Sequence, residues 1–258
     1  PKWNYASIYY NQAEEVVKNI MRECDGMITS TAKLKEVYSP YCKKISVIPN
    51  HLPKFIWGDI FPAHEYYDEK NKIKILWGGS QNHFSTKKIM GDDVKSEGDF
   101  GNELINFIKK TVDVYEWHFM GAMPEELDKI KNKIKFHPWE NTFNYPLVLK
   151  SIEPDICIAP LIDIEFNHCK SNIKCLEYTA AGAVGVYSDV TPYKFQSLRA
   201  NTDEEMIAHI EKLAIDIDFR AKIFKKDFQR VKSQLFWEDN DNILRYINTY
   251  LNMFNQCL

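Results

Sequence analysis

The sequence lacks three features that would each point to a particular class of protein. It has no apolar run of about 18 residues, so no membrane-spanning helix is expected. Its six cysteines form neither a C-x-x-C pair nor a disulfide framework, which indicates reduced thiols in a cytoplasmic protein. His168, Cys169 and Cys175 do not have the regular spacing of metal ligands, so no metal is expected. The formal net charge of −3 argues against binding nucleic acid through bulk electrostatics, although it allows a local basic patch.

The sequence does contain a regular alternation of strand and helix patterns. Its 258 residues, 45% hydrophobic and 27% charged, are typical of a globular protein with one or two domains. Strand patterns lie at 72–77, 114–120, 133–136, 155–160 and 183–188, and helical patterns lie near 102–110, 124–131 and 145–151 and, threefold, over 203–255. This alternation predicts an α/β fold, a Rossmann-like parallel sheet with helices on both faces.

The same patterns divide the chain into four segments. Residues 1–52 carry two short strand patterns of their own and form a separate unit. Prolines and aromatic residues in 53–71 predict a linker, and residues 72–235 form the main domain. Residues 236–258 have the apolar spacing of an amphipathic helix. Within the main domain, the acidic, glycine-bearing stretch 89–101 predicts a mobile loop.

The stretch "KSNIKCLEY", residues 170–178, has the composition of an anion site at the start of a helix. We expect Lys170 and Ser171 at the N-cap, so that the N–H groups of Asn172 and Ile173 face outward. Unpaired N–H groups at the positive end of a helix dipole bind anions such as phosphate.

Two charged residues of this helix extend the hypothesis to a nucleotide. Lys170 or Lys174 would add a positive charge beside a phosphate oxygen. Glu177 lies too deep in the helix to cap it, and its carboxylate could accept hydrogen bonds from the two hydroxyls of a ribose. The alternative is an ordinary amphipathic helix whose charged side chains are only solvated.

The stretch "WGGSQNHFST", residues 77–86, follows the first strand of the main domain. Gly78 and Gly79 let a ligand approach the backbone closely, and Ser80 and His83 supply polar groups at the end of the strand. The third glycine of the dinucleotide-binding fingerprint is missing, so this signal is weak on its own. His83 could equally be a structural histidine of the loop.

The stretch "KFHPWENTF", residues 135–143, ends a strand with two aromatic rings. Phe136 and Trp139 flank Pro138, and a flat aromatic wall with free backbone groups would suit a nucleobase. The alternative is that both rings pack in the core.

Taken in order along the chain, these motifs resemble the C-terminal half of the GT-B glycosyltransferases, in particular the large retaining family that uses nucleotide-sugar donors. The matching residues are Gly79, Ser80, His83, His137, Pro138, Trp139, Ala159, Pro160, Leu161, Phe166, Asn167, Lys170, Ser171, Lys174, Leu176, Glu177, Tyr178, Ala181, Gly182, Ser188, Asp189, Val190, Pro192 and Tyr193. The resemblance covers roughly residues 72 to 195. It continues upstream, where residues 1–52 are similar to the end of the N-terminal domain of this family.

The resemblance implies a role for each part of the site. Lys170 and Lys174 would serve the diphosphate, Glu177 the ribose, and Trp139 with its neighbours the base, while Asn167 would touch the donor sugar. The complete donor-binding set is then Gly79, Ser80, His83, Pro138, Trp139, Asn167, Ser171, Asn172 and Ile173, with Lys170, Lys174 and Glu177 as the catalytic group. It also implies that the helix at 236–258 crosses back to the first 50 residues, with Trp237 near the crossing point.

The sequence departs from the family in three places. Cys169 stands where many relatives have the first of two glutamates, the one that contacts the donor sugar. Ser80, His83, Lys87 and Lys88 occupy the loop in which relatives carry an Arg and a Lys for the diphosphate. A whole N-terminal domain would need about 100 further residues before Pro1, so the chain is expected to be truncated or to have a reduced first domain.

The leading functional hypothesis is therefore a metal-independent, cytoplasmic glycosyltransferase with a nucleotide-diphosphate sugar, of uridine or guanosine, as its donor and no other cofactor. Retention of anomeric configuration follows from the resemblance alone. The acceptor stays open among a glycan, a lipid-linked sugar and modified DNA. The alternatives are a subunit that binds nucleotide sugars without turnover and a phage-type enzyme that glycosylates DNA.

Overall fold

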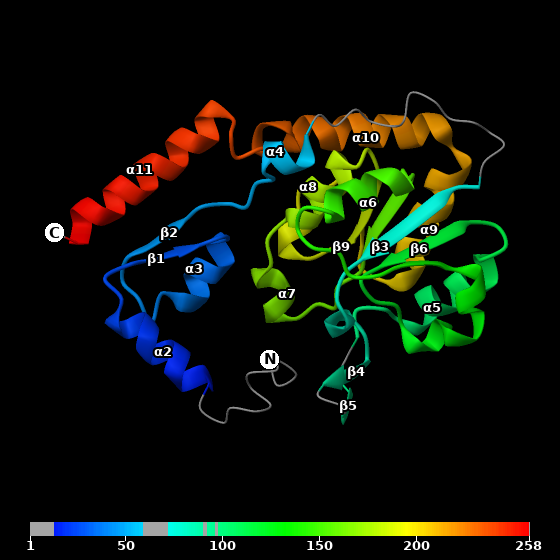
Figure 1. Ribbon diagram of the computed structural model, residues 1–258, viewed down its shortest axis with the longest axis horizontal. Helices are drawn as coiled ribbons and strands as arrows, with labels where there is room; N and C mark the ends of the chain where they lie inside the picture. Colours follow the sequence, from blue (N-terminus) through cyan, green and yellow to red (C-terminus); the bar gives the residue numbers. More distant parts are fainter. Residues whose placement is uncertain (1–12, 59–71, 90–91, 96–97, 258) are drawn as a thin grey trace.

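The computed structural model describes residues 13–58, 72–89, 92–95 and 98–257, and its largest sheet has six parallel strands (Figure 1). The strands are β3 (Lys74–Gly78), β6 (Glu116–Met120), β7 (Lys135–His137), β8 (Ile156–Ala159), β9 (Val184–Ser188) and β10 (Arg199–Ala200). The prediction of an α/β fold with a Rossmann-like parallel sheet is confirmed. The short strand β10 has no counterpart among the predicted strands.

The order of the strands in this sheet fixes where a ligand can bind. The order is β10-β9-β8-β3-β6-β7, so the chain moves outward in one direction from β3 and in the other direction from β8. In doubly wound sheets, a crevice opens at the carboxyl ends of the strands where the order reverses. Here that point lies above the ends of β3 and β8, next to Gly78 and Ala159.

Helices cover both faces of the sheet, as the sequence predicts. They are α5 (Asn102–Thr111), α6 (Tyr145–Ile152), α8 (Ile173–Ala180), α9 (Asp203–Ile215) and α10 (Ile217–Val231). One apolar core joins α5 and α9 to Trp117 and Phe119 of β6, and a second joins α6 and α8 to Leu76 and Cys157 on the opposite face. All four residues of β8 are buried, which is typical of a parallel strand covered on both sides.

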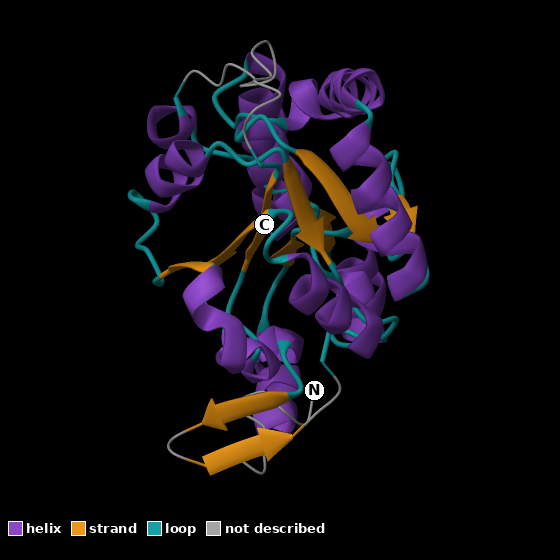
Figure 2. Cartoon of the chain, turned by 90° about the vertical axis from the view of Figure 1, so that its right-hand side faces the viewer, coloured by secondary structure: helices purple, strands orange, loops and turns teal. Residues whose placement is uncertain are grey.

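Two predicted elements differ in kind from the observed ones. The segment expected as a helix near 124–131 is a run of 3₁₀ turns, η3 (Glu125–Lys133), after Pro124. Part of the expected mobile loop at 89–101 is an antiparallel pair, β4 (Thr86–Ile89) with β5 (Asp92–Lys95). Figure 2 shows this pair standing apart from the main sheet. The acidic composition of this stretch gave no sign of the two strands.

A smaller unit precedes the main sheet. It contains α2 (Ala13–Glu23), β1 (Met27–Thr29), α3 (Ala32–Tyr38) and β2 (Ile45–Val47), with β1 and β2 paired in parallel. Thr31 caps α3, because its Oγ1 accepts a hydrogen bond of 3.1 Å from the N–H of Leu34. The two short strand patterns predicted within residues 1–52 thus form a two-stranded parallel sheet.

The chain passes between the two units twice at one place. The N–H of Leu52 donates to the carbonyl of Leu235 at 2.7 Å, and the N–H of Trp237 donates to the carbonyl of Leu52 at 3.2 Å. Beyond this point, α11 (Asn240–Cys257) runs back along the smaller unit (Figure 1), where Met253 lies against Gly26. The backbone of Trp237 lies at the crossing point, while the four segment boundaries drawn from the sequence stay predictions.

The expected linker is partly structured. α4 (Lys54–Trp57) follows the crossing point, and Trp57 is buried in the second core beside Tyr145 of α6. The N–H groups of Lys54 and Phe55 donate to the carboxylate of Glu238, which ties the start of α4 to the tail. The rest of the expected linker, 59–71, lies outside the described residues.

Candidate functional site

At the carboxyl ends of β3, β6 and β7, the backbones of Gly79 and Gly121 pack closely together, and this pair is called the glycine floor. The N–H of Gly79 donates to the carbonyl of Met120 at 2.9 Å, and the N–H of Gly121 donates to the carbonyl of His137 at 2.8 Å. Gly121 has φ +91°, and a Cβ atom there would lie 2.5 Å from the carbonyl oxygen of Gly79. Only glycine fits both constraints. Gly121 is a site residue that the sequence analysis missed, and its position directly after a buried strand was the available signal.

An aromatic ring lies beside this floor. Trp139 is 71% exposed, and its Cε3 would be 3.1 Å from a Cβ atom on Gly121. Phe136 is half exposed, and Pro138 is exposed between the two rings. Because both rings are exposed, they do not pack in the core, which was the alternative interpretation of this motif. The ring of Trp139 is open for stacking at the edge of the sheet.

Asp99 connects three loops at the same edge. Its Oδ2 lies 2.7 Å from Nδ1 of His83, and its Oδ1 accepts hydrogen bonds from the N–H of Ile162 at 2.9 Å and from Nδ2 of Asn167 at 3.2 Å. The Asp99 side chain is only 8% exposed. This carboxylate therefore holds the predicted residues His83 and Asn167 together, although the sequence assigned it to a mobile loop.

Burial and neighbouring charges shift the basic groups around Asp99. Burial lowers the pKa of His83, and the nearby lysines lower it further, while the hydrogen bond to Asp99 opposes both effects. Burial also lowers the pKa of Lys170, with Asp99 opposing and Lys174 reinforcing that shift. The lowered pKa favours a neutral His83, so the positive charge in this region comes from Lys170, near Asp99, and from Lys174, which pairs with Glu177.

The helix that carries the main motif begins one or two residues later than predicted. Asn172, not Lys170 or Ser171, is the N-cap of α8, and Lys170 ends the short helix α7 (Glu165–Cys169). Ser171 instead contacts the smaller unit, where its Oγ accepts a hydrogen bond of 2.8 Å from Nδ2 of Asn50. The N–H of Cys175 donates to the carbonyl of Asn172 at 2.8 Å, and the earlier N–H groups of Ile173 and Lys174 have no acceptor within the helix. The expected anion site, which stays a prediction, would therefore lie at Ile173 and Lys174.

The smaller unit contacts this region at a second point as well. Oγ1 of Thr31 donates to the carbonyl of Cys169 at 3.0 Å. Together with the Asn50–Ser171 bond, this places the start of α8 at the boundary between the two units. Figure 1 shows α3 facing α7 across that boundary.

Glu177 and Lys174 form a partly buried pair on the flank of α8 that faces α6. Lys174 Nζ lies 2.9 Å from Oε2 of Glu177, which also accepts a hydrogen bond of 3.0 Å from Oη of Tyr145. Burial disfavours the ammonium group, but the Glu177 carboxylate outweighs it and raises the pKa of Lys174. Oε1 of Glu177 makes no hydrogen bond with the described residues. Tyr145 was not predicted, and it fixes Glu177 in place.

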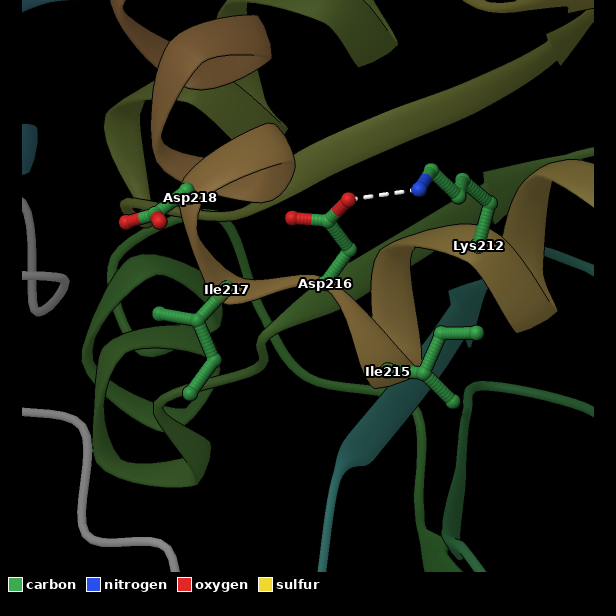
Figure 3. A pocket seen from close by; sticks show the side chains of 5 residues that line it. All are labelled: Lys212, Ile215, Asp216, Ile217 and Asp218. Carbon is green, nitrogen blue, oxygen red and sulfur yellow. Dashed lines mark hydrogen bonds and ion pairs between the residues drawn. The ribbon is translucent and has the colours of Figure 1, made fainter.

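A surface pocket between α9 and α10 lies at the opposite edge of the sheet from the candidate site. Lys212, Ile215, Asp216, Ile217 and Asp218 line it at the turn between α9 and α10 (Figure 3). Asp216 bonds Lys212 at 2.5 Å and caps α10 by accepting from the N–H of Phe219 at 2.9 Å. Arg220, in the first turn of α10, lies 3.8 Å from Asp155, which precedes β8. The pocket is therefore at the amino ends of the strands, and its polar groups serve the helix junction.

The described residues contain neither a metal-binding cluster nor a membrane-spanning helix. In the described ranges, no group of three or more His, Cys, Asp or Glu side chains could hold a metal ion. None of the helices within those ranges is both long and apolar enough to cross a membrane. His168, Cys169 and Cys175 do not converge: Cys175 is buried, and His168 bonds Asp163 at 2.5 Å and Thr191 at 2.7 Å.

Comparison with known proteins finds likeness at the level of structure only. No protein-family model matches the sequence, and no curated protein matches it either. Among solved structures, HepE of Anabaena, in complex with UDP and glucose, has a TM-score of 0.66 at 10% identity over 93% of this chain and 68% of its own. TarM of S. aureus, in complex with fondaparinux, alpha-GlcNAc-glycerol and UDP, has a TM-score of 0.57 at 12% identity over 95% of this chain.

These likenesses define the fold. TarM and HepE are GT-B glycosyltransferases, and the chain described here has the GT-B glycosyltransferase fold that its motifs resemble. The chain spans 46% of the length of TarM, about half of that protein.

Proposed function

We propose that this chain is the donor-binding part of a glycosyltransferase that transfers a sugar from a nucleotide-diphosphate sugar to an acceptor hydroxyl. The observation that carries the proposal is the clustering of Glu177, Lys174, Lys170 and His83 around the start of α8, at the point where the strand order reverses. A fold of this kind binds its ligand at that place. The UDP held by both structural neighbours supports uridine as the base.

Each group has a task in this proposal. The free N–H groups of α8 and the ammonium groups of Lys170 and Lys174 bind the diphosphate. Oε1 of Glu177 accepts from the ribose, and Trp139 stacks on the base above the glycine floor. Ser80 and His83 contact the diphosphate from the side of β3, and Asn167 contacts the donor sugar.

The cations would act on the bond that breaks. When the anomeric carbon separates from the phosphate oxygen, the bonding electrons stay on the diphosphate, and its negative charge grows. The acceptor oxygen bonds to the anomeric carbon, and its proton passes to the departing phosphate. Donors fixed around the diphosphate stabilise this charge without a metal ion. Retention of configuration, a cytoplasmic location and metal independence belong to the proposal.

The experiment is a calorimetric titration of the protein with UDP, comparing wild type with Glu177→Gln. Glutamine keeps an acceptor for Lys174 and Tyr145 but removes the charge that faces the ribose. Loss of a charged hydrogen-bond acceptor is worth about 1.5–3 kcal/mol, so the affinity should fall roughly tenfold or more. Glu211→Gln, an exposed change of the same kind on α9, is the control and should leave the affinity unchanged. An equal effect of both variants would refute the ribose assignment.

Turnover separates an enzyme from a subunit that only binds the donor. Incubation with UDP-glucose should release UDP slowly by hydrolysis in the wild type, and Lys174→Met should reduce that rate because the leaving diphosphate loses a cation. Binding of UDP with no release of UDP from the sugar would favour the non-catalytic subunit.

A further inference from the structure

A cavity of about 440 Å³ lies on the other flank of α8, away from Tyr145 and Glu177. Its wall comes from four elements: the N-cap of α8, the segment from η4 (Thr191–Tyr193) to β10, the end of α10, and η5 (Lys232–Gln234). Gly79, His83, Trp139 and Lys174 do not contribute to it. The volume falls in the range of small-molecule sites in proteins.

Three basic side chains line this cavity, and no carboxylate does. Two of them form ion pairs: Arg199 lies 2.9 Å from Asp189, and Arg230 lies 3.2 Å from Asp227. Arg230 also donates to the carbonyl of Phe195 at 2.6 Å. The third, Lys194, is exposed and forms no ion pair within the described part of the chain. Asp189 and Asp227 balance the two arginines, so Lys194 leaves the cavity with a net positive charge.

The two guanidinium groups are prepared for an anion. Every hydrogen bond that they form with the described residues uses Nη1. Nη2 and Nε of Arg199 and Arg230 therefore keep their N–H donors, in side chains whose position the aspartates already fix. A planar donor pair held in place is suited to the oxygens of a phosphate group.

The rest of the wall is suited to hydroxyl groups. Three carboxamides line it, from Asn172, Gln196 and Gln234, and each offers both a donor and an acceptor. Gln196 is only 7% exposed, and its Oε1 is buried without a hydrogen-bond partner among the described residues. An unpaired buried acceptor costs free energy, and a small rotation of this amide toward a bound hydroxyl would remove that cost.

We propose that this cavity binds a phosphate ester of a small sugar or polyol, with the phosphate on Arg199, Arg230 and Lys194 and the hydroxyls on the carboxamides. The cavity shares one residue, Asn172 at the N-cap of α8, with the donor-binding set, and the proposal does not depend on the proposed function. It touches the crossing point between the two units, because the carbonyl of Gln234 lies 2.7 Å from Nδ1 of His51, the neighbour of Leu52.

The test is a calorimetric titration of the whole chain with glucose 6-phosphate, inorganic phosphate and glucose, in the presence of saturating UDP. Glucose 6-phosphate should bind at least tenfold more tightly than inorganic phosphate, and glucose should not bind measurably. Lys194→Glu, which changes an exposed residue, should weaken the ester at least tenfold. Lys225→Glu makes the same charge change at an exposed position of α10 and should have no effect.

Further outcomes separate the alternatives. Equal binding of inorganic phosphate and the ester would overturn the role of the carboxamides, and Gln196→Leu should reduce the preference for the ester if that role is correct. If the ester binds in the absence of UDP but not in saturating UDP, or binds more weakly to Glu177→Gln, while Lys194→Glu has no effect, the ester occupies the donor site and the cavity proposal is refuted. Failure of the wild type to bind the ester, with UDP binding intact, would refute this proposal and leave the proposed function standing.

Discussion

Replacing Asp99 with asparagine tests the reasoning about the site most directly, because the change keeps the shape of the side chain and removes its charge. In the wild type, this carboxylate accepts from Ile162 and Asn167 and pairs with His83. In Asp99→Asn, the remaining oxygen can still accept from Ile162 and Asn167. The new NH₂ group then faces Nδ1 of His83, so that His83 must carry its proton on Nε2.

The size of the effect follows from the three bonds. Hydrogen bonds to a charged group contribute about 1.5–3 kcal/mol each, and neutral ones contribute about 0.5–1.5 kcal/mol. The loss of charge assistance on three bonds should lower the free energy of unfolding by about 2–3 kcal/mol. In a chain of this length, that corresponds to a fall in Tm of about 4–12 °C. Asp99→Ala leaves the two N–H donors unpaired and should cost more.

Urea denaturation followed by circular dichroism measures this free energy, and nitrogen-15 chemical shifts of the His83 ring report its tautomer. Asp163→Asn is the matched control, since Asp163 also pairs with a histidine, His168 at 2.5 Å, but its side chain is 83% exposed. Exposed substitutions of this kind stay within about 0.5 kcal/mol. If both variants lose the same stability, Asp99 does not organise the site.

Three further predictions concern metal dependence, pH and the tail. Sugar transfer should persist in EDTA because lysines supply the positive charge, and loss of activity with recovery in Mn²⁺ would contradict the proposed stabilisation of the leaving group. Burial lowers the pKa of His118, and a bond of 2.7 Å to Glu116 opposes this shift. In the unfolded chain His118 has its ordinary pKa near 6.5, so below that pH the unfolded chain takes up a proton that the folded chain does not. The free energy of unfolding should therefore fall as the pH drops from 7 to 5.5, and His118→Gln should show a weaker dependence in urea titrations at each pH. Deleting residues 236–258 should make 13–50 sensitive to limited proteolysis while the main sheet stays resistant, and equal protection of both would show that α11 does not hold the smaller unit.

The parts of the site that lie on one local motif could be predicted from the sequence. Lys174 and Glu177 are neighbours on one helix, and a spacing of three residues is enough to pair them. Strand ends and glycine turns are local in the same sense, which is why the α/β alternation and the loop after β3 were predictable.

The parts that depend on distant contacts could not be predicted. Asp99 meets Ile162 and Asn167, which are 63 and 68 residues away, and its own surroundings in the sequence suggest only a loop. The sequence placed Ser171 at the N-cap of α8, and it could not show that Ser171 contacts Asn50, 121 residues away, instead. Tyr145 meets Glu177 across 32 residues, and nothing in its own helical pattern indicates that contact.

The double passage of the chain at Leu52 has a mechanical consequence. Two connections run side by side between the units there, and two backbone hydrogen bonds join them, from Leu52 to Leu235 and from Trp237 to Leu52. A single tether would leave the units free to swing and slide in every direction. Two tethers joined at one point oppose sliding and pulling apart, and what they leave soft is a turn about the line on which they meet. A turn about that line would separate α3 from α7, and it would have to break the hydrogen bonds from Thr31 to Cys169 and from Asn50 to Ser171 that join the units there.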